Sequence, residues 1–354
     1  MAERCLSYGT RSPGRLAMLQ QEAAFVRLSA NVLVLSLFLA VAASSASSQS
    51  CNFVTSSSAM TLAADCTTTS TITIPDGVTL NGQNHTITAV NPPGASFLGP
   101  VVTNAVGATR ASVKNVILDA PNLGLQQQIC QNPVSGILFD SVSGSITGTT
   151  VLHMVNASAD GNTICILNFG IHIMNTTTGA PVNVTVSASK VLLAGTQAAL
   201  FAEGSGVVVT VSGSQFQSGV PPTFSNLVSV WLNGVGGSFT GNTVEASPGG
   251  GGGGIFLQAT AVGTKITSNN INLIGGQTTD GILIGADNAV ISGNRVFNYG
   301  TSGNVVSAGI DNGGLTNPAT NKIMKNEVRC YATPFVNVSV TTYSGNKVLP
   351  CPWP

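Results

Sequence analysis

The second half of this chain repeats one short phrase: a small or polar residue, an asparagine, any residue and an aliphatic residue. The phrase closes on Val244, Ile271, Val296, Val328 and Val348, so successive copies are 27, 25, 32 and 20 residues apart. β-Rich repeats of about 25 residues are typical of solenoids, in which each coil contacts only its neighbours. The period therefore predicts short strands stacked around one long core, and it indicates little about chemistry.

A second phrase indicates which way the residues of each coil face. Seven segments begin with a small residue followed by an aliphatic one, as in residues 136–140 and 281–285. Because side chains alternate across a strand, the second and fourth positions should face the core and the third and fifth should face outward. The second positions form the row that we predict to stack inside the solenoid: Ile137, Ile171, Leu200, Val230, Ile255, Ile282 and Ile310.

The asparagines of the first phrase have a structural explanation. Glycine supplies a bend, and asparagine tolerates a left-handed backbone. Each asparagine amide is expected to stack on the asparagine of the next coil, while the aliphatic residue returns to the core. We therefore predict an internal ladder of Asn242, Asn269, Asn294, Asn326 and Asn346.

The two ends of the repeat region differ from its middle. Residues 66–90 are rich in Thr and Ile and contain the turn signal Pro75-Asp76-Gly77, so they are expected to open and cap the stack. Residues 331–354 should cover the other end, because an exposed terminal coil promotes aggregation. We predict a single domain over residues 51–354, an all-β solenoid of about ten coils.

Composition excludes several classes of protein. Charged residues make up 7% of the chain, against about 25% in an ordinary domain, and the formal net charge is zero. Without a basic stripe, nucleic acid is a poor partner. The only histidines are His85, His153 and His172, and no Cys-x-x-Cys motif occurs, so no metal site and no cofactor are expected.

The first 46 residues resemble a secretory signal. Arg27 precedes an apolar run from Val32 to Ala43, and small residues follow, with a cleavage zone near Ala42 or Ala46. The run has about twelve residues, which is short for a hydrocarbon core of ~30 Å, so no stable membrane span is expected. A retained signal anchor is the alternative. The protein is therefore predicted to be secreted or held at the cell surface.

Six cysteines follow the signal and suit an exported protein. They lie as near neighbours along the chain, and proximity alone pairs Cys51 with Cys66, Cys130 with Cys165 and Cys330 with Cys351. Six cysteines allow fifteen connectivities, so other pairings stay open. Five Asn-x-Ser/Thr sequons are candidate glycosylation sites in a host that glycosylates secreted proteins: Asn84, Asn156, Asn175, Asn183 and Asn337.

The repeated phrases resemble the right-handed parallel β-helix superfamily of pectate lyases, polygalacturonases and alginate epimerases. The likeness covers roughly residues 66–350 and is carried by residues 136–139, 149–151, 281–284 and 293–296. It implies the fold, but this fold hosts many activities. The chain lacks the Asp-Asp pair and Gly-His-Gly segment of the polygalacturonases and any three acids in matched positions, so no motif residue is carried over.

An enzymatic hypothesis rests on Asp140, His172 and Glu203, which fall on outward positions of three successive coils. Asp140 and Glu203 would lie two coils apart, ~9.6 Å at strand spacing, near the upper limit of ~9.5 Å for an inverting glycosidase. His172 would then transfer protons between them. The simpler explanation, which we favour, is that the two acids are solvated turn residues and His172 is an outward polar residue.

A binding hypothesis rests on aromatic residues in the outward third position. Phe201, Trp231 and Phe256 would stack at strand spacing, with Asn233 and Gln258 beside them. Sugar rings pack on aromatic faces while their hydroxyls bind polar groups. The alternative is that a loop or a partner chain buries these rings.

The expected partner is a polysaccharide or surface glycan, bound rather than cleaved. A structural or adhesive role without a small ligand is the third possibility. Arg295, Lys322, Lys325 and Arg329 form a modest basic patch near the C-terminal end of the repeat. The sequence does not indicate an oligomeric state.

Overall fold

In the computed structural model, the described residues are 50–121, 123, 134–154, 168–177, 180–194, 198–219, 228–246, 253–258, 261–273, 280–299, 308–313, 320–338 and 343–351. The chain divides into two units, Met1–Ser48 and Gln49–Pro354. The first unit, with the expected signal, lies outside the described residues. So do Cys130, Cys165 and Asn156. Within the described ranges, no helical segment has the length and hydrophobicity that a bilayer crossing requires.

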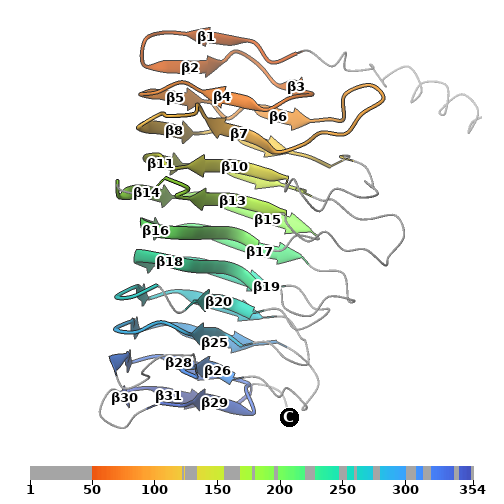
Figure 1. The fold of residues 1–354 in the computed structure, drawn as a ribbon. Helices are drawn as coiled ribbons and strands as arrows, with labels where there is room; N and C mark the ends of the chain where they lie inside the picture. The colour runs from red at the N-terminus through yellow and green to blue at the C-terminus, as the bar shows by residue number, and fades with distance from the viewer. Residues whose placement is uncertain are drawn as a thin grey trace, which may run out of the picture. The chain divides into compact units, whose positions relative to one another are not determined.

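The second unit is a right-handed parallel β-helix, as the sequence predicts. Its strands stack level upon level in Figure 1 and form three faces. In the described residues the first two faces merge into one 20-stranded sheet, because β16 (Ala198–Ser212) and β18 (Val228–Thr240) are long enough to run through both. The third face is a separate sheet with 11 described strands, against about ten predicted coils.

The first face continues on either side of β16 and β18 with eight shorter strands that pair in parallel. These are β4 (Ile72–Ile74), β7 (Pro100–Asn104), β10 (Ser135–Asp140), β13 (Phe169–Met174), β20 (Gly253–Leu257), β23 (Ile282–Ile284), β26 (Ala308–Asp311) and β29 (Thr333–Val336). Its inward row is confirmed, since the seven predicted aliphatic residues pair strand to strand from Ile137 to Ile310 and are at most 1% exposed.

The second face carries outward rows of hydroxyl groups that the sequence analysis did not identify. Its remaining strands are β1 (Phe53–Thr55), β2 (Ala59–Leu62), β5 (Val78–Asn81), β8 (Arg110–Lys114), β11 (Ser143–Thr147), β14 (Val182–Ser187), β21 (Lys265–Thr267), β24 (Val290–Ser292), β27 (Lys322–Met324) and β30 (Tyr343–Ser344). One outward row runs in register through Thr79, Ser112, Ser145, Thr185, Thr210 and Ser238. Neighbouring hydroxyls bond to each other, as Ser145 does to Ser112 at 3.1 Å.

The third face contains β3 (Cys66–Thr68), β6 (Thr86–Ala89), β9 (Ile117–Asp119), β12 (Thr150–Leu152), β15 (Lys190–Ala194), β17 (Gln215–Gly219), β19 (Thr243–Ala246), β22 (Asn270–Leu273), β25 (Arg295–Asn298), β28 (Glu327–Arg329) and β31 (Lys347–Leu349). Between the second and third faces the chain turns within two residues, and the predicted asparagine ladder occupies this turn.

The ladder is confirmed, and every asparagine in it uses both ends of its amide. The Nδ2 of Asn242 donates to the Oδ1 of Asn269 at 3.1 Å, and the same bond repeats through Asn294, Asn326 and Asn346. In the preceding coils serine replaces asparagine, and Ser214 donates its N–H to the Oδ1 of Asn242. These bonds satisfy buried backbone groups that a two-residue turn leaves unpaired.

One detail of the predicted turn is wrong. The left-handed backbone belongs to the residue before each asparagine, with φ of 66° at Gly241 and 56° at Lys325, and not to the asparagine itself. The second phrase, as in residues 281–285, needs a small first residue for a different reason. A Cβ on Gly281 would overlap the Val296 side chain and the carbonyl of Gly309, so the third-face core leaves no room for one.

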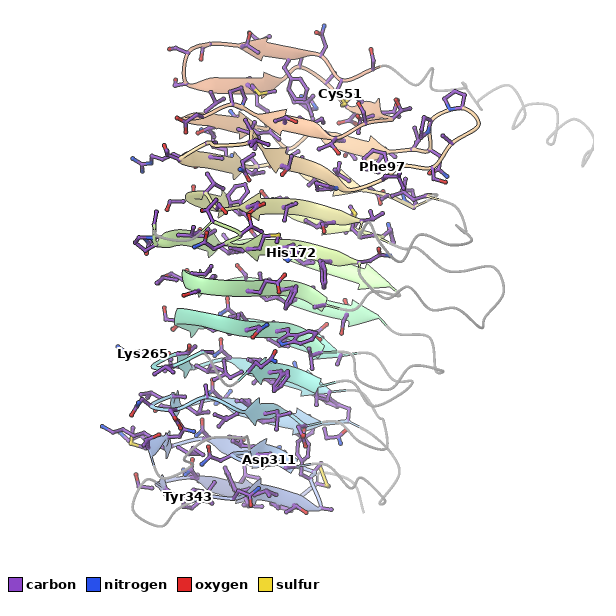
Figure 2. The ribbon with its side chains drawn as sticks, in the orientation of Figure 1. Cys51, Phe97, His172, Lys265, Asp311 and Tyr343 are labelled. Carbon is purple, nitrogen blue, oxygen red and sulfur yellow. A yellow bond between two sulfur atoms is a disulfide. The ribbon has the colours of Figure 1, made fainter. Side chains whose placement is uncertain are left out.

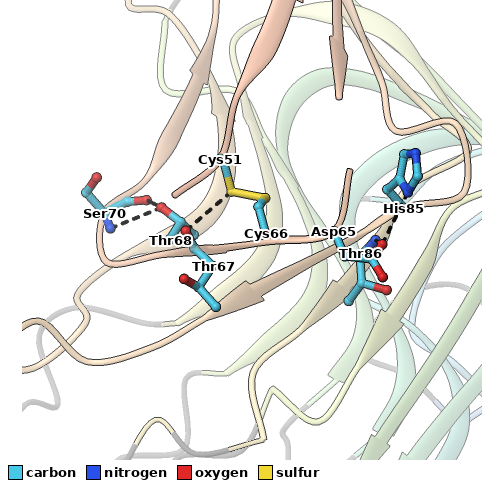
Figure 3. Close-up of a disulfide and its surroundings, with 8 residues drawn as sticks. All are labelled: Cys51, Asp65, Cys66, Thr67, Thr68, Ser70, His85 and Thr86. Carbon is cyan, nitrogen blue, oxygen red and sulfur yellow. Dashed lines mark hydrogen bonds and ion pairs between the residues drawn. A yellow bond between two sulfur atoms is a disulfide. The ribbon is translucent and has the colours of Figure 1, made fainter. Parts of the chain in front are cut away.

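The N-terminal end is capped by an antiparallel hairpin and not by residues 66–90. Strand β1 pairs antiparallel with β2, which then joins β5 of the parallel stack, while residues 66–90 already form stacked coils. The predicted Cys51–Cys66 disulfide anchors this end, and Figure 3 shows it beside the pair of Asp65 and His85. Cys330 and Cys351 are also bonded, as predicted. Two disulfides are typical of proteins that mature in an oxidising compartment.

Candidate functional site

The outward third and fifth positions of the first face form two adjacent rows, which we call the outer strip. The third-position row is confirmed in register, and its members are Leu138, His172, Phe201, Trp231, Phe256, Leu283 and Asp311. Figure 2 labels His172 and Asp311 in this row. The fifth-position row pairs in the order Asp140, Met174, Glu203 and Asn233.

Aromatic rings contact one another in a row along the middle of the outer strip. The ring centroids of His172 and Phe201 are 5.0 Å apart, those of Phe201 and Trp231 are 4.9 Å apart, and those of Trp231 and Phe256 are 5.9 Å apart. His172 and Phe201 are only 6% and 7% exposed, whereas Trp231 and Phe256 are half-buried. The accessible part of the aromatic row is therefore its Trp231–Phe256 end.

Phe169 extends this aromatic cluster, and sequence reasoning missed it. Its ring lies 4.7 Å from His172 and 4.8 Å from Phe201. Strict alternation counted back from Ile171 places Phe169 inward, but alternation breaks at the small residue of the phrase. This small residue is Gly170 here and Gly136 in the preceding coil. A Cβ on Gly136 would point at Val151 of the core, so the small residue and the aliphatic residue that follows it both face inward.

The structure brings His172 and Glu203 together. The Nε2 of His172 lies 3.0 Å from the Oε1 of Glu203, and their side chains are 8% and 32% exposed. The flat contact of the imidazole with the Phe201 ring, at an interplanar angle of 22°, fixes the ring plane and so the direction of the bond to Glu203. The glutamate thus combines a positioned carboxylate with access to solvent.

Glu203 borders a depression where β16 bends from the first face into the second. The register of β16 shifts between Glu203 and Val207, and Gly204 has a φ of 109°, which favours glycine. The depression has a volume of about 580 Å³. Its lining residues are Met174, Asn175, Glu203, Gly204, Ser205, Gly206 and Asn233. We call it the glutamate depression.

Asn175 closes one wall of the glutamate depression. Its Nδ2 donates to the carbonyl of Ser205 at 2.9 Å and to that of Ala180 at 3.3 Å. The amide of this sequon is therefore already engaged. Among the other sequons, Asn84, Asn183 and Asn337 are exposed, and their modification stays a prediction.

Asp140 is committed to a turn and does not join His172 and Glu203. Its Oδ1 accepts hydrogen bonds from the hydroxyl of Ser141 at 2.8 Å and from the hydroxyl of Thr176 at 2.7 Å. It also accepts the N–H of Thr176 at 3.3 Å. The three residues proposed for catalysis are therefore a close pair and a separate turn-forming carboxylate.

The far end of the outer strip contains polar groups that pair with their neighbours. The Nε1 of Trp231 donates to the Oε1 of Gln258 at 3.0 Å, which fixes the indole relative to the next coil. Asp311 accepts hydrogen bonds from the N–H of Gly313 and from the Nδ2 of Asn337. Among the described residues, no cluster of three metal-ligating side chains occurs.

A half-buried carboxyl, that of Asp280, accepts the N–H of Ala308 at this end of the strip. Burial raises the pKa of the Asp280 carboxyl, the N–H of Ala308 lowers it in part, and the charge of Asp311 raises it further. Burial also raises the pKa of the Tyr331 hydroxyl, as does the nearby Asp280 carboxylate. Tyr331 is only 8% exposed, so its hydroxyl offers no donor to a ligand on the outer strip.

The chain was compared with known proteins. No protein-family model matches it, and no curated protein sequence matches it. Tailspike protein 3 of bacteriophage CBA120 is similar in structure, with a TM-score of 0.40 and 16% identity over 84% of this chain and 57% of the tailspike. The chain thus corresponds to little more than half of that protein's length.

Two epimerases are also similar in structure. The periplasmic alginate epimerase AlgG has a TM-score of 0.42 and 9% identity over 82% of this chain and 85% of its own. The A-module of the Azotobacter vinelandii mannuronan C-5 epimerase AlgE4 has a TM-score of 0.34 and 13% identity over 79% of this chain and 80% of its own. These identities and TM-scores indicate nothing about a shared ligand. By its fold, the chain is a right-handed parallel β-helix protein.

Proposed function

We propose that this protein is exported and binds a polysaccharide along the outer strip. The observation that supports this most is the pair of half-buried rings, Trp231 and Phe256, whose centroids lie 5.9 Å apart on the face that also holds the glutamate depression. Glu203 and Asn233 lie two residues further along the same strands as Phe201 and Trp231. A row of aromatic groups and a row of polar groups therefore lie side by side within reach of a single extended ligand.

The chemistry of the strip fits a sugar chain. The apolar face of a pyranose ring packs on an indole or phenyl ring, and its hydroxyls need acceptors and donors at the edge. Glu203 supplies an acceptor and Asn233 an amide at the border of the depression. A volume of about 580 Å³ falls within the range of ~300–1,000 Å³ that is usual for ligand sites.

A glycan array with the purified exported protein, followed by titration of the best ligand, tests this proposal. We expect Trp231→Ala to reduce affinity by about tenfold, the effect of losing ~1.4 kcal/mol of stacking. Leu98→Ala is the control, since it removes an exposed apolar side chain that lies outside the outer strip. Unchanged affinity in a folded Trp231→Ala protein would refute the proposal, and Asn233→Ala, which should also weaken binding, provides an independent test at the depression.

Catalysis on a bound glycan is a second candidate, supported by the 3.0 Å contact of His172 and Glu203. Glu203 would exchange a proton with the sugar, and His172 would hold the carboxylate in position. Asp140, two strands away at ~9.6 Å, would be the second carboxylate of a hydrolase only through its Oδ2, because Ser141 and Thr176 occupy its Oδ1. The assay is release of reducing ends or unsaturated sugars from the bound glycan.

The variants separate binding from catalysis. An enzyme should lose product formation in Glu203→Gln and Asp140→Ala while it still binds glycan. Equal product release by both variants and the native protein would exclude this chemistry. If no glycan binds at all, the third possibility applies, namely a structural or adhesive protein of the cell surface.

A further inference from the structure

A second depression lies on the third face, near the C-terminal end of the stack. It has a volume of about 430 Å³ and contains charged, aromatic and amide side chains. Its lining residues are Asn270, Asn272, Arg295, Val296, Phe297, Tyr299, Glu327, Arg329 and Leu349. We call it the arginine depression. It belongs to β22, β25, β28 and β31, whereas the outer strip belongs to the other sheet.

Strand register concentrates positive charge here. Arg295 pairs with Glu327, which pairs in turn with Lys347, so these three charges form one outward row. Arg329 lies in the adjacent outward row, paired with Phe297 and Leu349. Three cations and one carboxylate thus lie on neighbouring positions.

The basic patch expected from the sequence is therefore divided between faces. Lys322 belongs to β27 of the other sheet, and Lys325 lies in the turn that precedes the third face. Only Arg295 and Arg329 of the original four line the depression. Strand register, and not proximity along the chain, therefore determines which cationic side chains lie together in the depression.

Arg329 is held in place but poorly neutralised. Its guanidinium carbon lies 5.7 Å from the centroid of the Phe297 ring, a cation–π distance. Its Nη2 lies 3.4 Å from the Oε1 of Glu327, longer than the ~2.7–2.9 Å of a strong charge-assisted bond. Its Nε is buried and has no acceptor among the described residues. The described residues thus leave part of the donor capacity of this guanidinium unused.

Aromatic rings form one wall of the arginine depression. Phe297 and Tyr299 meet edge to face with centroids 4.1 Å apart, and Tyr299 is 42% exposed. An exposed ring beside two guanidinium groups offers an apolar surface and an anion site to the same ligand. Asn270 and Asn272, on the adjacent strand, add amides at the opposite border.

We propose that the arginine depression binds a uronic acid residue of an acidic polysaccharide. Arg295 and Arg329 bind the carboxylate, because a planar guanidinium matches a planar carboxylate in shape and charge. Tyr299 packs against the sugar ring, and the asparagine amides bind its hydroxyls. This site is separate from the outer strip and acts whether or not the strip binds a ligand.

Titration of the full exported protein with an oligogalacturonate, and with the same oligomer reduced at its carboxyl groups, tests the proposal. We expect the reduced oligomer to bind at least about tenfold more weakly, and Arg329→Ala to cause a similar loss for the acidic oligomer, since charged hydrogen bonds contribute ~1.5–3 kcal/mol. Affinity should also fall as salt rises. Lys265→Ala is the control, an exposed cation on the other sheet.

Three outcomes would overturn the assignment. The first is equal binding of the acidic and reduced oligomers. The second is an unchanged affinity in Arg295→Gln, a substitution at an exposed position that does not depend on how Arg329 is packed. The third is equally tight binding of the reduced oligomer after sulfate esters are added in place of its carboxylates, with the same arginine dependence, which would show that the site does not select uronic acids.

Discussion

The asparagine ladder offers the most direct prediction about what holds the coils together. Asn269 is 2% exposed, and its Oδ1 accepts two bonds from Asn242, from the backbone N–H at 2.9 Å and from Nδ2 at 3.1 Å. Its Nδ2 donates to the carbonyl of Phe239 at 2.8 Å and to the Oδ1 of Asn294 at 2.9 Å. Truncating this single side chain therefore removes four buried hydrogen bonds.

The size of the effect follows from which groups lose their only partner. In Asn269→Ala, two N–H groups of Asn242 are left buried without an acceptor. The Oδ1 of Asn294 keeps one bond, from the backbone N–H of residue 269. An orphaned buried donor costs about 1–3 kcal/mol, so we expect a loss of about 2–6 kcal/mol in the free energy of unfolding. That is a large share of the ~5–15 kcal/mol of a typical domain.

The chain contains its own control and an intermediate substitution. Asn270 is the next residue, and its side chain is exposed on the third face, so Asn270→Ala should change stability by less than about 0.5 kcal/mol. Asn269→Ser should fall between the two, because Ser214 takes the same place in an earlier coil and its Oγ accepts the N–H of Ser189 at 3.1 Å.

Urea unfolding followed by far-ultraviolet circular dichroism measures these differences. Because a solenoid can open locally, hydrogen exchange at the amide of Asn242 should be measured as well, and it should accelerate in Asn269→Ala. If Asn269→Ala and Asn270→Ala lose the same amount of stability, or if neither loses more than about 0.5 kcal/mol, the ladder does not hold the coils as described.

Three further changes test other parts of the account. Burial raises the pKa of Asp280 above 3.8, so its stabilising contribution is complete below that pH and is lost as pH rises through the folded pKa. Asp280→Asn should accordingly be more stable than the native chain at pH 7 and equal to it near pH 3, as urea midpoints would show. Gly281→Ala should cost about 1–3 kcal/mol through overpacking, and an unchanged melting temperature would contradict this. Replacing Cys51 and Cys66 by serine opens a 15-residue loop and should cost about 3 kcal/mol, with early exchange of the β1–β2 hairpin amides.

The fold could be predicted because its repeat imposes the same requirement on every coil. The inward row from Ile137 to Ile310 and the five-asparagine ladder each recur at one position per coil, so a periodic pattern identifies them. The serine members of the ladder, Ser189 and Ser214, were missed because a pattern of asparagines does not include them, although a serine Oγ can accept a backbone N–H of the neighbouring coil as an asparagine Oδ1 does. The antiparallel β1–β2 cap was missed because it occurs only once, at the end of the stack, and so produces no repeated sequence pattern.

The candidate site could be predicted only where the strands are regular. The third-position row followed from alternation and was confirmed, including the neighbours Phe201 and Trp231. Phe169 and the glutamate depression both depend on local departures from alternation, at the glycine position of the phrase and at the irregularity after Glu203. Such departures depend on packing between coils, which no short sequence pattern reports.

Hydroxyl-radical footprinting of the exported protein, with and without a saturating neutral glycan selected on the array, is the most direct test of the central claim. The account predicts that oxidation of Trp231 and Phe256 falls when the glycan binds, while oxidation of Tyr299 on the third face is unchanged. Unchanged oxidation of Trp231 and Phe256 with the glycan bound would show that the outer strip is not where this protein meets its ligand.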